Sequence, residues 1–416
     1  MKKLLATLII VFAVGVATAS AADDVVLQWQ RVLGQTVETP GQQPGNIHPM
    51  RSFAMMNLAM FDAMNSIEGG YNAYLTNVPG TKNASSNAAA ARAAHDVLAV
   101  LYPTRVDVFD AELAASLKGI PSNRAYQGER VGSIVARRML SYRADDGWDA
   151  PWTPFELDMT PGNWQGPTPF PGFAVFTNIT GVTPFGMTSG TQFLPSSPPA
   201  LSSASYAASL QEVKDLGSAG SANRTPDQTL TAFLWANPPV SDGKMMGVVA
   251  STSLQQGLTP FQRARLFALV CVSFHDALQT TLTSQYTYGR WRPVTAIRRA
   301  DEDGNGDTVP DPSWESLLGP AGTPPHPSYA SNASSVSAAV AKTLELFYAA
   351  DNIPFQIDHG AGFGGVRDYA SFSALTNEIA RSRVFGGVHF SYDTAAGQQA
   401  GRDVAAYAFS HYMAPR

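Results

Sequence analysis

The sequence has a single cysteine and few charged residues. Cys271 has no partner for an intramolecular disulfide, and it lies in the apolar run LFALVCVSF, so we expect a buried, unreactive thiol. Only 15% of the residues are charged, the net charge is −5, and no run is rich in lysine and arginine. A nucleic-acid partner is therefore not expected, because nucleic-acid-binding proteins present a basic stripe. Stability must come from packing, and 416 residues can bury a substantial core.

Only the N-terminus has a long hydrophobic run, and it is typical of a secretory signal. Lys2 and Lys3 precede an apolar stretch over residues 4–16, and small residues suited to cleavage follow at 19–21. We expect a signal peptide over residues 1–21, with an uncleaved anchor helix as the alternative. No later run approaches the roughly 20 apolar residues that span a bilayer. The mature protein is therefore expected to be periplasmic or secreted, with no stable membrane span.

No segment alternates convincingly in the manner of a half-buried strand, whereas helical periodicity recurs throughout. In RSFAMMNLAMFDAMNSI, the residues Phe53, Met56, Met60 and Met64 recur at spacings of three and four, which predicts an apolar stripe facing the core. The sequence therefore predicts an all-α protein. Besides this segment, the expected helices cover residues 86–101, 122–143, 203–217, 225–236, 259–284, 331–349, 369–384 and about 394–412.

Residues 150–200 interrupt the helical pattern with many prolines, glycines and aromatic residues. The segment is too apolar for a disordered linker, so we expect a long ordered loop that packs on the helices and could shape the mouth of a site. We divide the mature chain into an N-terminal helical half over 22–200 and a second half over 201–416. One domain, in which the first half buttresses the second, is preferred to two. The oligomeric state is left open.

The segment DEDGNGD at 301–307 invites interpretation as a calcium loop. Asp301, Asp303 and Asn305 match the first positions of such a loop, but Pro312 stands where a bidentate glutamate is required. A turn between helices is therefore the preferred interpretation, since glycine, asparagine and aspartate favour turns.

The segment ARSRVFGGVHFSYD carries the first cluster that could support chemistry. Arg383 offers a planar fork of donors suited to a tetrahedral oxyanion, and the glycines at 386–387 allow a close backbone approach. Asp393 follows His389 by about one helical turn, where it could accept a ring N–H and fix the tautomer. The other ring nitrogen would then be free to attack or to ligate. A surface arginine and a buried structural histidine are the alternative.

Two further segments favour an anion. In YGRWRPVTAIRRAD, Arg292 precedes a proline and is expected just ahead of a helix, where the guanidinium and the helix N-terminus both attract negative charge. Arg298 and Arg299 are expected on a solvated face. In TPPHPSYASNASSVSAAV, the amides of residues 332–333 could donate to an oxyanion at a helix start. Helix capping by Ser331 is the alternative there.

In this order, the three segments resemble the family of vanadium-dependent haloperoxidases and type 2 phosphatidic acid phosphatases, which includes acid phosphatases. The family pattern is Lys, six residues and Arg-Pro, then Pro-Ser-Gly-His, then Ser-Arg, five residues and His. RWRPVTAIR and SRVFGGVHF match it closely, and AAAARAAHDVL and LTPFQRARLFALVCVSFHDAL look like the bacterial haloperoxidase-related branch. The resemblance covers roughly residues 45–412. It implies an all-helical fold built around a helix bundle, with the oxyanion at its core.

The resemblance also implies a role for each matching residue. Arg292 and Arg383 would clamp the oxygens of the anion, Ser331 would donate from its hydroxyl, and Asn332 would donate from its backbone. His389 would be the axial group. In a haloperoxidase that histidine ligates the vanadium of bound vanadate, and in a phosphatase it attacks phosphorus to form a phosphohistidine.

The sequence departs from the family at three positions. Asn332 replaces the family's glycine, a change that is tolerated where the backbone conformation suits asparagine. Gln285 stands where the family has its lysine, and Ala333 stands where the family has the histidine that acts as general acid and base. General acid–base catalysis contributes roughly 10²–10⁴-fold in rate. The change at residue 333 would therefore cripple turnover while leaving oxyanion binding in place. Arg290 or Lys244 could supply the charge that is missing at Gln285.

His326 lies seven residues before Ala333 on the same loop and could replace the missing acid. Prolines flank it on both sides, so a rigid entry to the following helix is the preferred interpretation of this segment.

Three functions remain open from the sequence. The preferred one is an exported vanadium haloperoxidase-like protein that binds vanadate and oxidises a halide with peroxide at reduced efficiency. The second is an acid-phosphatase-type phosphoesterase acting through phospho-His389. The third is a non-catalytic oxyanion-binding or scaffold relative, a pseudoenzyme. Whether the protein is an enzyme is left undecided, and vanadate is the one expected cofactor, with an oxyanion and a small molecule as partners.

Overall fold

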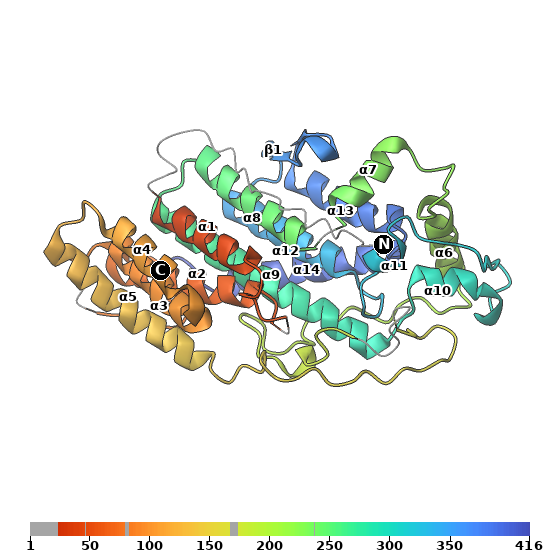
Figure 1. The fold of residues 1–416 in the computed structure, drawn as a ribbon, viewed down its shortest axis with the longest axis horizontal. Coiled ribbons are helices and arrows are strands. Elements are labelled where there is room, and N and C mark those ends of the chain that lie inside the picture. Colours follow the sequence, from red (N-terminus) through yellow and green to blue (C-terminus); the bar gives the residue numbers. More distant parts are fainter. Residues whose placement is uncertain (1–23, 46, 80–82, 167–173, 237) are drawn as a thin grey trace, which may run out of the picture.

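The computed structural model describes residues 24–45, 47–79, 83–166, 174–236 and 238–416. The expected signal peptide at 1–21 lies outside these residues. The described chain is an elongated helical bundle (Figure 1). Its α-helices are α1 Val25–Glu38, α2 Met50–Glu68, α3 Ser86–Leu101, α4 Val106–Leu117, α5 Ser122–Tyr142, α6 Ala204–Leu216, α7 Pro226–Leu234, α8 Pro238–Gln255, α9 Pro260–Tyr288, α10 Pro293–Arg298, α11 Gly319–Gly322, α12 Asn332–Tyr348, α13 Phe372–Phe385 and α14 Ser391–His411.

The all-α prediction is confirmed, and a helix lies in each predicted segment. Helices α1, α4, α8 and the four-residue α11 were not predicted. Nor was a short antiparallel hairpin of β1 (Phe355–Asp358) and β2 (Val366–Tyr369). In β1 the buried Phe355 and Ile357 alternate with exposed residues, but four residues are too few for the alternation to stand out in the sequence.

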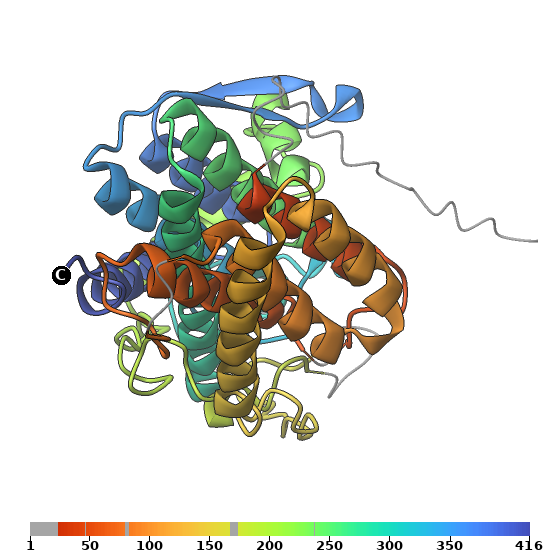
Figure 2. The ribbon, with the colours of Figure 1, turned by 90° about the vertical axis from the view of Figure 1, so that its left-hand side faces the viewer.

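Helix α9 is the centre of the molecule. It contacts α2 of the N-terminal half and α12 and α14 of the C-terminal half, as the two ribbon views show (Figures 1 and 2). Thr259 and Gln262 form a capping box at its start, and Gly289 ends it in the left-handed conformation. By length and composition α9 could cross a membrane, but its apolar window is 100% buried within the protein. That burial is typical of the core helix of a bundle.

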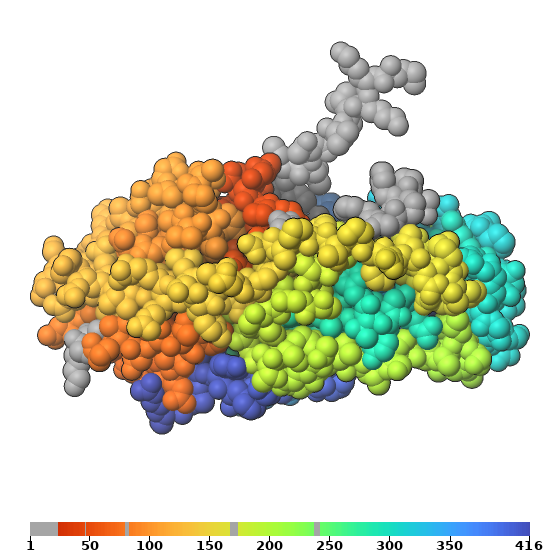
Figure 3. All heavy atoms as spheres, turned by 90° about the horizontal axis from the view of Figure 1, so that it is seen from below, coloured from red at the N-terminus to blue at the C-terminus, as the bar shows by residue number. Residues whose placement is uncertain are grey.

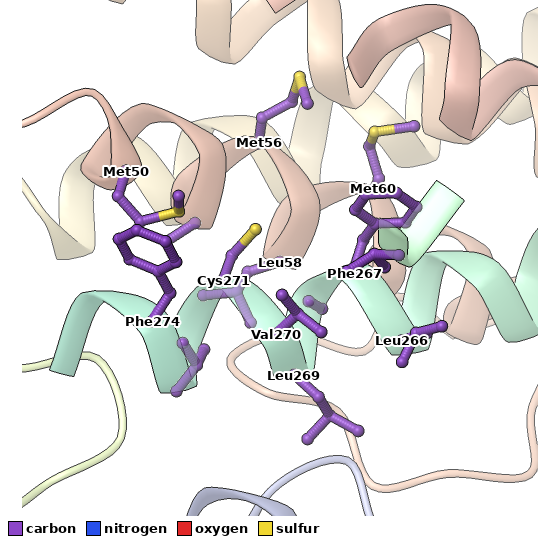
Figure 4. Packing of buried hydrophobic residues seen from close by; sticks show 14 of the residues in the cluster. Met50, Met56, Leu58, Met60, Leu266, Phe267, Leu269, Val270, Cys271 and Phe274 are labelled. Atoms are coloured by element: carbon purple, nitrogen blue, oxygen red, sulfur yellow. The ribbon is translucent and has the colours of Figure 1, made fainter. Parts of the chain in front are cut away.

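The methionine stripe of α2 is buried in the core, as predicted. Figure 4 shows Met50 near Phe274 of α9, whereas Met56 points away from that helix. Cys271 lies in the same core without exposed surface, and burial raises the pKa of its thiol. The expected inert thiol is therefore confirmed, because the raised pKa suppresses the reactive thiolate.

Polar side chains on α9 hold the segment 150–200 against the bundle. The Asp276 carboxylate accepts hydrogen bonds from the backbone amides of residues 185–187 at 2.6–2.9 Å, and Gln279 Nε2 donates to the carbonyl of Val182 at 2.6 Å. Figure 3 shows the segment along one face of the molecule. For the residues that are described, the prediction of an ordered, packed loop is confirmed.

The segment 301–307 forms a turn. Asp303 Oδ1 accepts hydrogen bonds from the Asn305 amide at 2.7 Å and from the Thr308 hydroxyl at 3.0 Å. The carboxylate therefore closes the loop on itself, in agreement with the preferred interpretation.

Helices α12 and α14 approach each other through two glycines of α14. A Cβ atom on Gly397 would overlap the carbonyl oxygen of Ser331, and one on Gly401 would overlap the carbonyl oxygen of Ser335. Only glycine permits this distance between backbones. The contact fixes the start of α12 against the helix that follows His389, and both helix starts contribute to the candidate site.

We expect Gly401→Ala to lower the free energy of unfolding by about 1–3 kcal/mol, because the added methyl group forces two packed backbones apart. Gly247 in α8 is the control, since an added Cβ there meets no atom within 4 Å. Gly247→Ala should raise stability by about 0.4–1 kcal/mol. Urea unfolding of both variants measures the contrast, and equal effects would refute the packing argument.

Candidate oxyanion site

The three anion-favouring segments meet in the folded chain at the Arg292 side chain. Arg292 Nη1 lies 3.0 Å from His389 Nε2, and Arg292 Nη2 lies 3.0 Å from His326 Nδ1. All three side chains are buried. Residues separated by 34 to 97 positions in the sequence are thus brought into hydrogen-bonding distance.

Arg292 is held in place by backbone carbonyls. It precedes α10 in an extended conformation, as predicted from Pro293, and donates to the carbonyls of His326 at 2.9 Å and Val388 at 2.8 Å. Burial lowers the pKa of its guanidinium to about 9, so the group stays charged at neutral pH. The side chains of Arg298 and Arg299 are partly exposed, as expected for a solvated face.

His389 and Asp393 form the predicted pair. His389 Nδ1 lies 3.1 Å from Asp393 Oδ2, and that oxygen also accepts hydrogen bonds from the Ser328 hydroxyl at 2.5 Å and the Phe390 amide at 3.1 Å. This arrangement assigns the ring proton to Nδ1 and the lone pair to Nε2. Burial, followed by the nearby Arg292 charge, lowers the pKa of His389 and keeps the ring neutral. Burial raises the pKa of Asp393 to about 7.

The glycines before His389 do permit a close approach, but the partner is protein. Gly387 has φ +75°, and a Cβ atom there would meet the carbonyl oxygen of Gly217. The glycine therefore lets the chain turn tightly between α13 and α14 and brings Arg383 and His389 toward the same region.

Arg383 has a hydrogen-bond donor that no described residue accepts from. Its side chain lies in the last turn of α13, and Nη1 donates to the carbonyl of Trp235 at 2.8 Å. Its Nε atom is buried and has no hydrogen-bond partner among the described residues. Burial lowers the pKa of the guanidinium to about 10, which still leaves it charged. A buried, charged donor without a partner is costly unless a ligand completes it.

A cavity of about 100 Å³ adjoins Arg383, which is room for one tetrahedral anion. His326, Asn332 and Ala333 contribute to its wall. Asn332 and Ala333 are the first two residues of α12, where backbone amides have no intrahelical carbonyl to bond. The cavity thus combines a guanidinium, a helix N-terminus and small side chains. These groups fit an oxyanion.

His389 does not line this cavity, because Arg292 covers the reactive side of the ring. The Nε2 atom that would ligate or attack faces Arg292 Nη1 at 3.0 Å. Axial contact between His389 and an anion would require Arg292 to turn away. The structure therefore brings the predicted residues together, but Arg292 separates His389 Nε2 from the cavity.

Ser331 acts as the N-cap of α12. Its hydroxyl oxygen accepts hydrogen bonds from the Ser334 amide at 3.4 Å and from the Ser334 hydroxyl at 3.1 Å, and Ser331 does not line the cavity. Helix capping, the alternative considered from the sequence, describes this geometry. Ser331 does not contact the cavity, so the structure does not support the oxyanion-donor role that the family resemblance implies for it.

Gln285 ties α9 to the loop before α12. Its Nε2 donates to the carbonyl of Ala330 at 2.7 Å, so an amide tether occupies the family's lysine position. Neither candidate for the missing charge lines the cavity. Lys244 Nζ lies 2.9 Å from His359 Nδ1, and Arg290 donates to a loop carbonyl at 3.2 Å.

His326 lies closer to the site than its proline-rich context suggested. Its side chain lines the cavity, and its Nδ1 lies within hydrogen-bonding distance of Arg292 Nη2. Three more cavity residues were not singled out from the sequence: His48 before α2, Trp235 after α7, and Asp242 in α8. Each belongs to a segment far from the three clusters.

Comparison with known proteins relates the fold to that of haloperoxidases. Residues 265–416 match the family model of the VCPO second helical-bundle domain. Over 233 residues the chain is 26% identical to the vanadium chloroperoxidase of Curvularia inaequalis, a match that spans 42% of this chain and 38% of that protein. A bacterial vanadium-dependent iodoperoxidase is similar in structure, with a TM-score of 0.76 and 23% identity over 95% of this chain and 98% of that one. The chain therefore shares the fold of vanadium haloperoxidases, and its residues 265–416 match the model of one of their helical-bundle domains.

Two structures of a bacterial vanadium-dependent chloroperoxidase share the haloperoxidase fold. The apo form has a TM-score of 0.71 and 19% identity over 90% of this chain and 94% of that one. The holo form has the same TM-score and identity over 92% and 96%. The haloperoxidase family match at 265–416 contains Arg292, Arg383 and His389, whereas His48 and Asp242 lie outside it.

Proposed function

We propose that this protein is an exported, vanadium haloperoxidase-like protein that binds vanadate or a similar tetrahedral oxyanion in the cavity beside Arg383. The observation that carries the proposal is the buried Nε of Arg383, which has no partner among the described residues, on a side chain that lines the same cavity as the start of α12. The signal-like N-terminus supports export. In this role the protein oxidises a halide with peroxide at reduced efficiency.

Each residue of the site has a defined task in this proposal. Arg383 and the amides of Asn332 and Ala333 hold the anion's oxygens, and Arg292 contributes a second positive charge. Asp393 fixes the tautomer of His389 so that Nε2 presents a lone pair. Vanadate, when bound, supplies the Lewis-acidic centre at which peroxide is activated. The apolar walls of the cavity exclude water and strengthen these interactions.

A second candidate is an oxyanion-binding relative without turnover. Two observations favour it: Ala333 provides no acid or base, and Arg292 covers His389 Nε2. A phosphatase acting through His389 would need the same nitrogen, so the covering by Arg292 disfavours that reaction as well.

Calorimetric titration of the purified protein with vanadate and with phosphate tests the proposal. We expect one anion per chain and an affinity that weakens as salt rises, because paired guanidinium and anion charges are screened. Halide oxidation, followed as halogenation of a phenol dye with vanadate and peroxide, then separates the haloperoxidase from the non-catalytic candidate. Absence of binding by both anions would overturn the proposed function.

A further inference from the structure

A histidine and a carboxyl group from outside the α10, α12 and α14 segments line the oxyanion cavity. His48 precedes α2, Asp242 belongs to α8, and both share the cavity wall with Ala333 and Arg383. His48 Nε2 lies 3.6 Å from Asp242 Oδ2, which is an electrostatic contact rather than a hydrogen bond. We propose that Asp242, paired with His48, presents a proton to the bound oxyanion and so replaces the donor that Ala333 lacks. This inference rests on the proposed function.

The tautomer of His48 suits this pairing. The backbone amide of Met50 donates to His48 Nδ1 at 3.3 Å, so the ring proton resides on Nε2 and points toward Asp242. The N–H dipole then stabilises Oδ2, and the other carboxyl oxygen is free to carry a proton. A carboxylic acid that stays protonated donates a hydrogen bond to an anion, whereas a carboxylate repels one.

The cavity wall keeps that proton on Asp242 near neutral pH. The wall is largely apolar, with Trp235, Phe274 and Leu278 among its residues. Burial raises the pKa of Asp242 to about 7, and burial together with the neighbouring His275 lowers the pKa of His48 to about 3. Near neutral pH the carboxyl group is therefore protonated about half of the time, and the ring stays neutral with its single proton on Nε2. The Asp242 side chain retains 21% exposure, through which the proton can exchange with solvent.

The other titratable groups at the cavity cannot take this role. His326 Nδ1 faces the Arg292 guanidinium, and burial and that charge lower the pKa of His326, so the ring has no second proton to give. Arg383 is a permanent cation whose charge favours an anion but whose proton is not released at neutral pH. Among the described residues that line the cavity, Asp242 is the one carboxylic acid. His326 is a positioning residue for Arg292.

Sulfate is the probe of choice, because it stays a dianion across the pH range and has the tetrahedral shape of vanadate. Calorimetric titration should show that wild-type protein binds sulfate at least about tenfold more weakly at about pH 8.5 than at about pH 6, since Asp242 must be protonated for the anion to bind. Asp242→Asn donates a hydrogen bond at every pH, so its affinity should be the same at both. Asp403→Asn on α14, where Asp403 accepts from Gln399, should keep the wild-type profile.

A second measurement does not depend on the folding of any variant. Wild-type titrations near pH 7 in two buffers of different ionisation enthalpy report proton uptake, and we expect roughly half a proton per sulfate bound. Uptake of no proton, or a wild-type pH profile in Asp242→Asn, would overturn the role of Asp242 while leaving the anion site intact. Wild-type protein that binds no sulfate at either pH would overturn both the site and this inference.

Discussion

Ala333→His is expected to raise the rate of halide oxidation, measured with vanadate and peroxide, by about 10²–10⁴-fold. Ala333 lies in the first turn of α12 and lines the cavity beside Arg383. An imidazole at this position would stand at the wall of the cavity that Arg383 also lines. It would restore a group that takes and returns a proton within reach of the anion.

Two controls separate proton transfer from a change of shape. Ala333→Leu fills similar volume without a titratable group, so it should leave the rate at the wild-type level. Anion affinity, measured by calorimetry, should change little in Ala333→His relative to its effect on rate. If both variants raise the rate equally, the missing side chain is not what limits turnover in this protein.

Arg383→Met should weaken vanadate and sulfate binding by about 10- to 100-fold, the cost of about 1.5–3 kcal/mol for a charge-assisted hydrogen bond. The matched control is Arg381→Met on the same helix. Arg381 is 41% exposed and pairs with Glu212 at 2.5 Å, away from the cavity residues. Calorimetry should give wild-type affinity for Arg381→Met. Equal affinities for both variants would exclude Arg383 as the anion's partner.

Arg383→Met should change the free energy of unfolding only slightly. Arg383 is a buried cation with an unpartnered Nε, so replacing it with an apolar side chain removes a desolvation cost that offsets the lost bond to Trp235. Arg263 is equally buried but pairs with Asp24. Arg263→Met should therefore cost about 3–5 kcal/mol, because it leaves a buried carboxylate without its cation. Urea unfolding should show Arg383→Met within about 1 kcal/mol of wild type or more stable than it.

Sequence periodicity and motif order were sufficient for the helical fold, for the position of Arg292 ahead of α10 and for the pairing of His389 with Asp393. The reason is physical: a proline after Arg292 and a four-residue spacing in α14 dictate local geometry directly. Helix α8 was missed because glycine and proline stand among its residues. Glycine and proline have low helix propensity, so the sequence of α8 does not by itself predict a helix.

The cavity itself could not be predicted, because its wall comes from segments without a shared pattern. His48, Asp242 and His326 each carry local signals of a turn or a solvated helix, and only tertiary packing brings them beside Arg383. The arrangement in which Arg292 covers His389 was equally hidden. Motif spacing places both residues at one site but does not specify which donor faces which acceptor.

The glycine contacts between α12 and α14 separate the shape of the site from its chemistry. Because Gly397 and Gly401 meet the backbone oxygens of Ser331 and Ser335, main-chain atoms set the distance between the two helices. Substitutions at residues 285 and 333 leave these contacts untouched. A lineage can therefore lose the catalytic histidine and still inherit a pocket of the original form, ready either for a different ligand or for the recovery of catalysis by a single replacement.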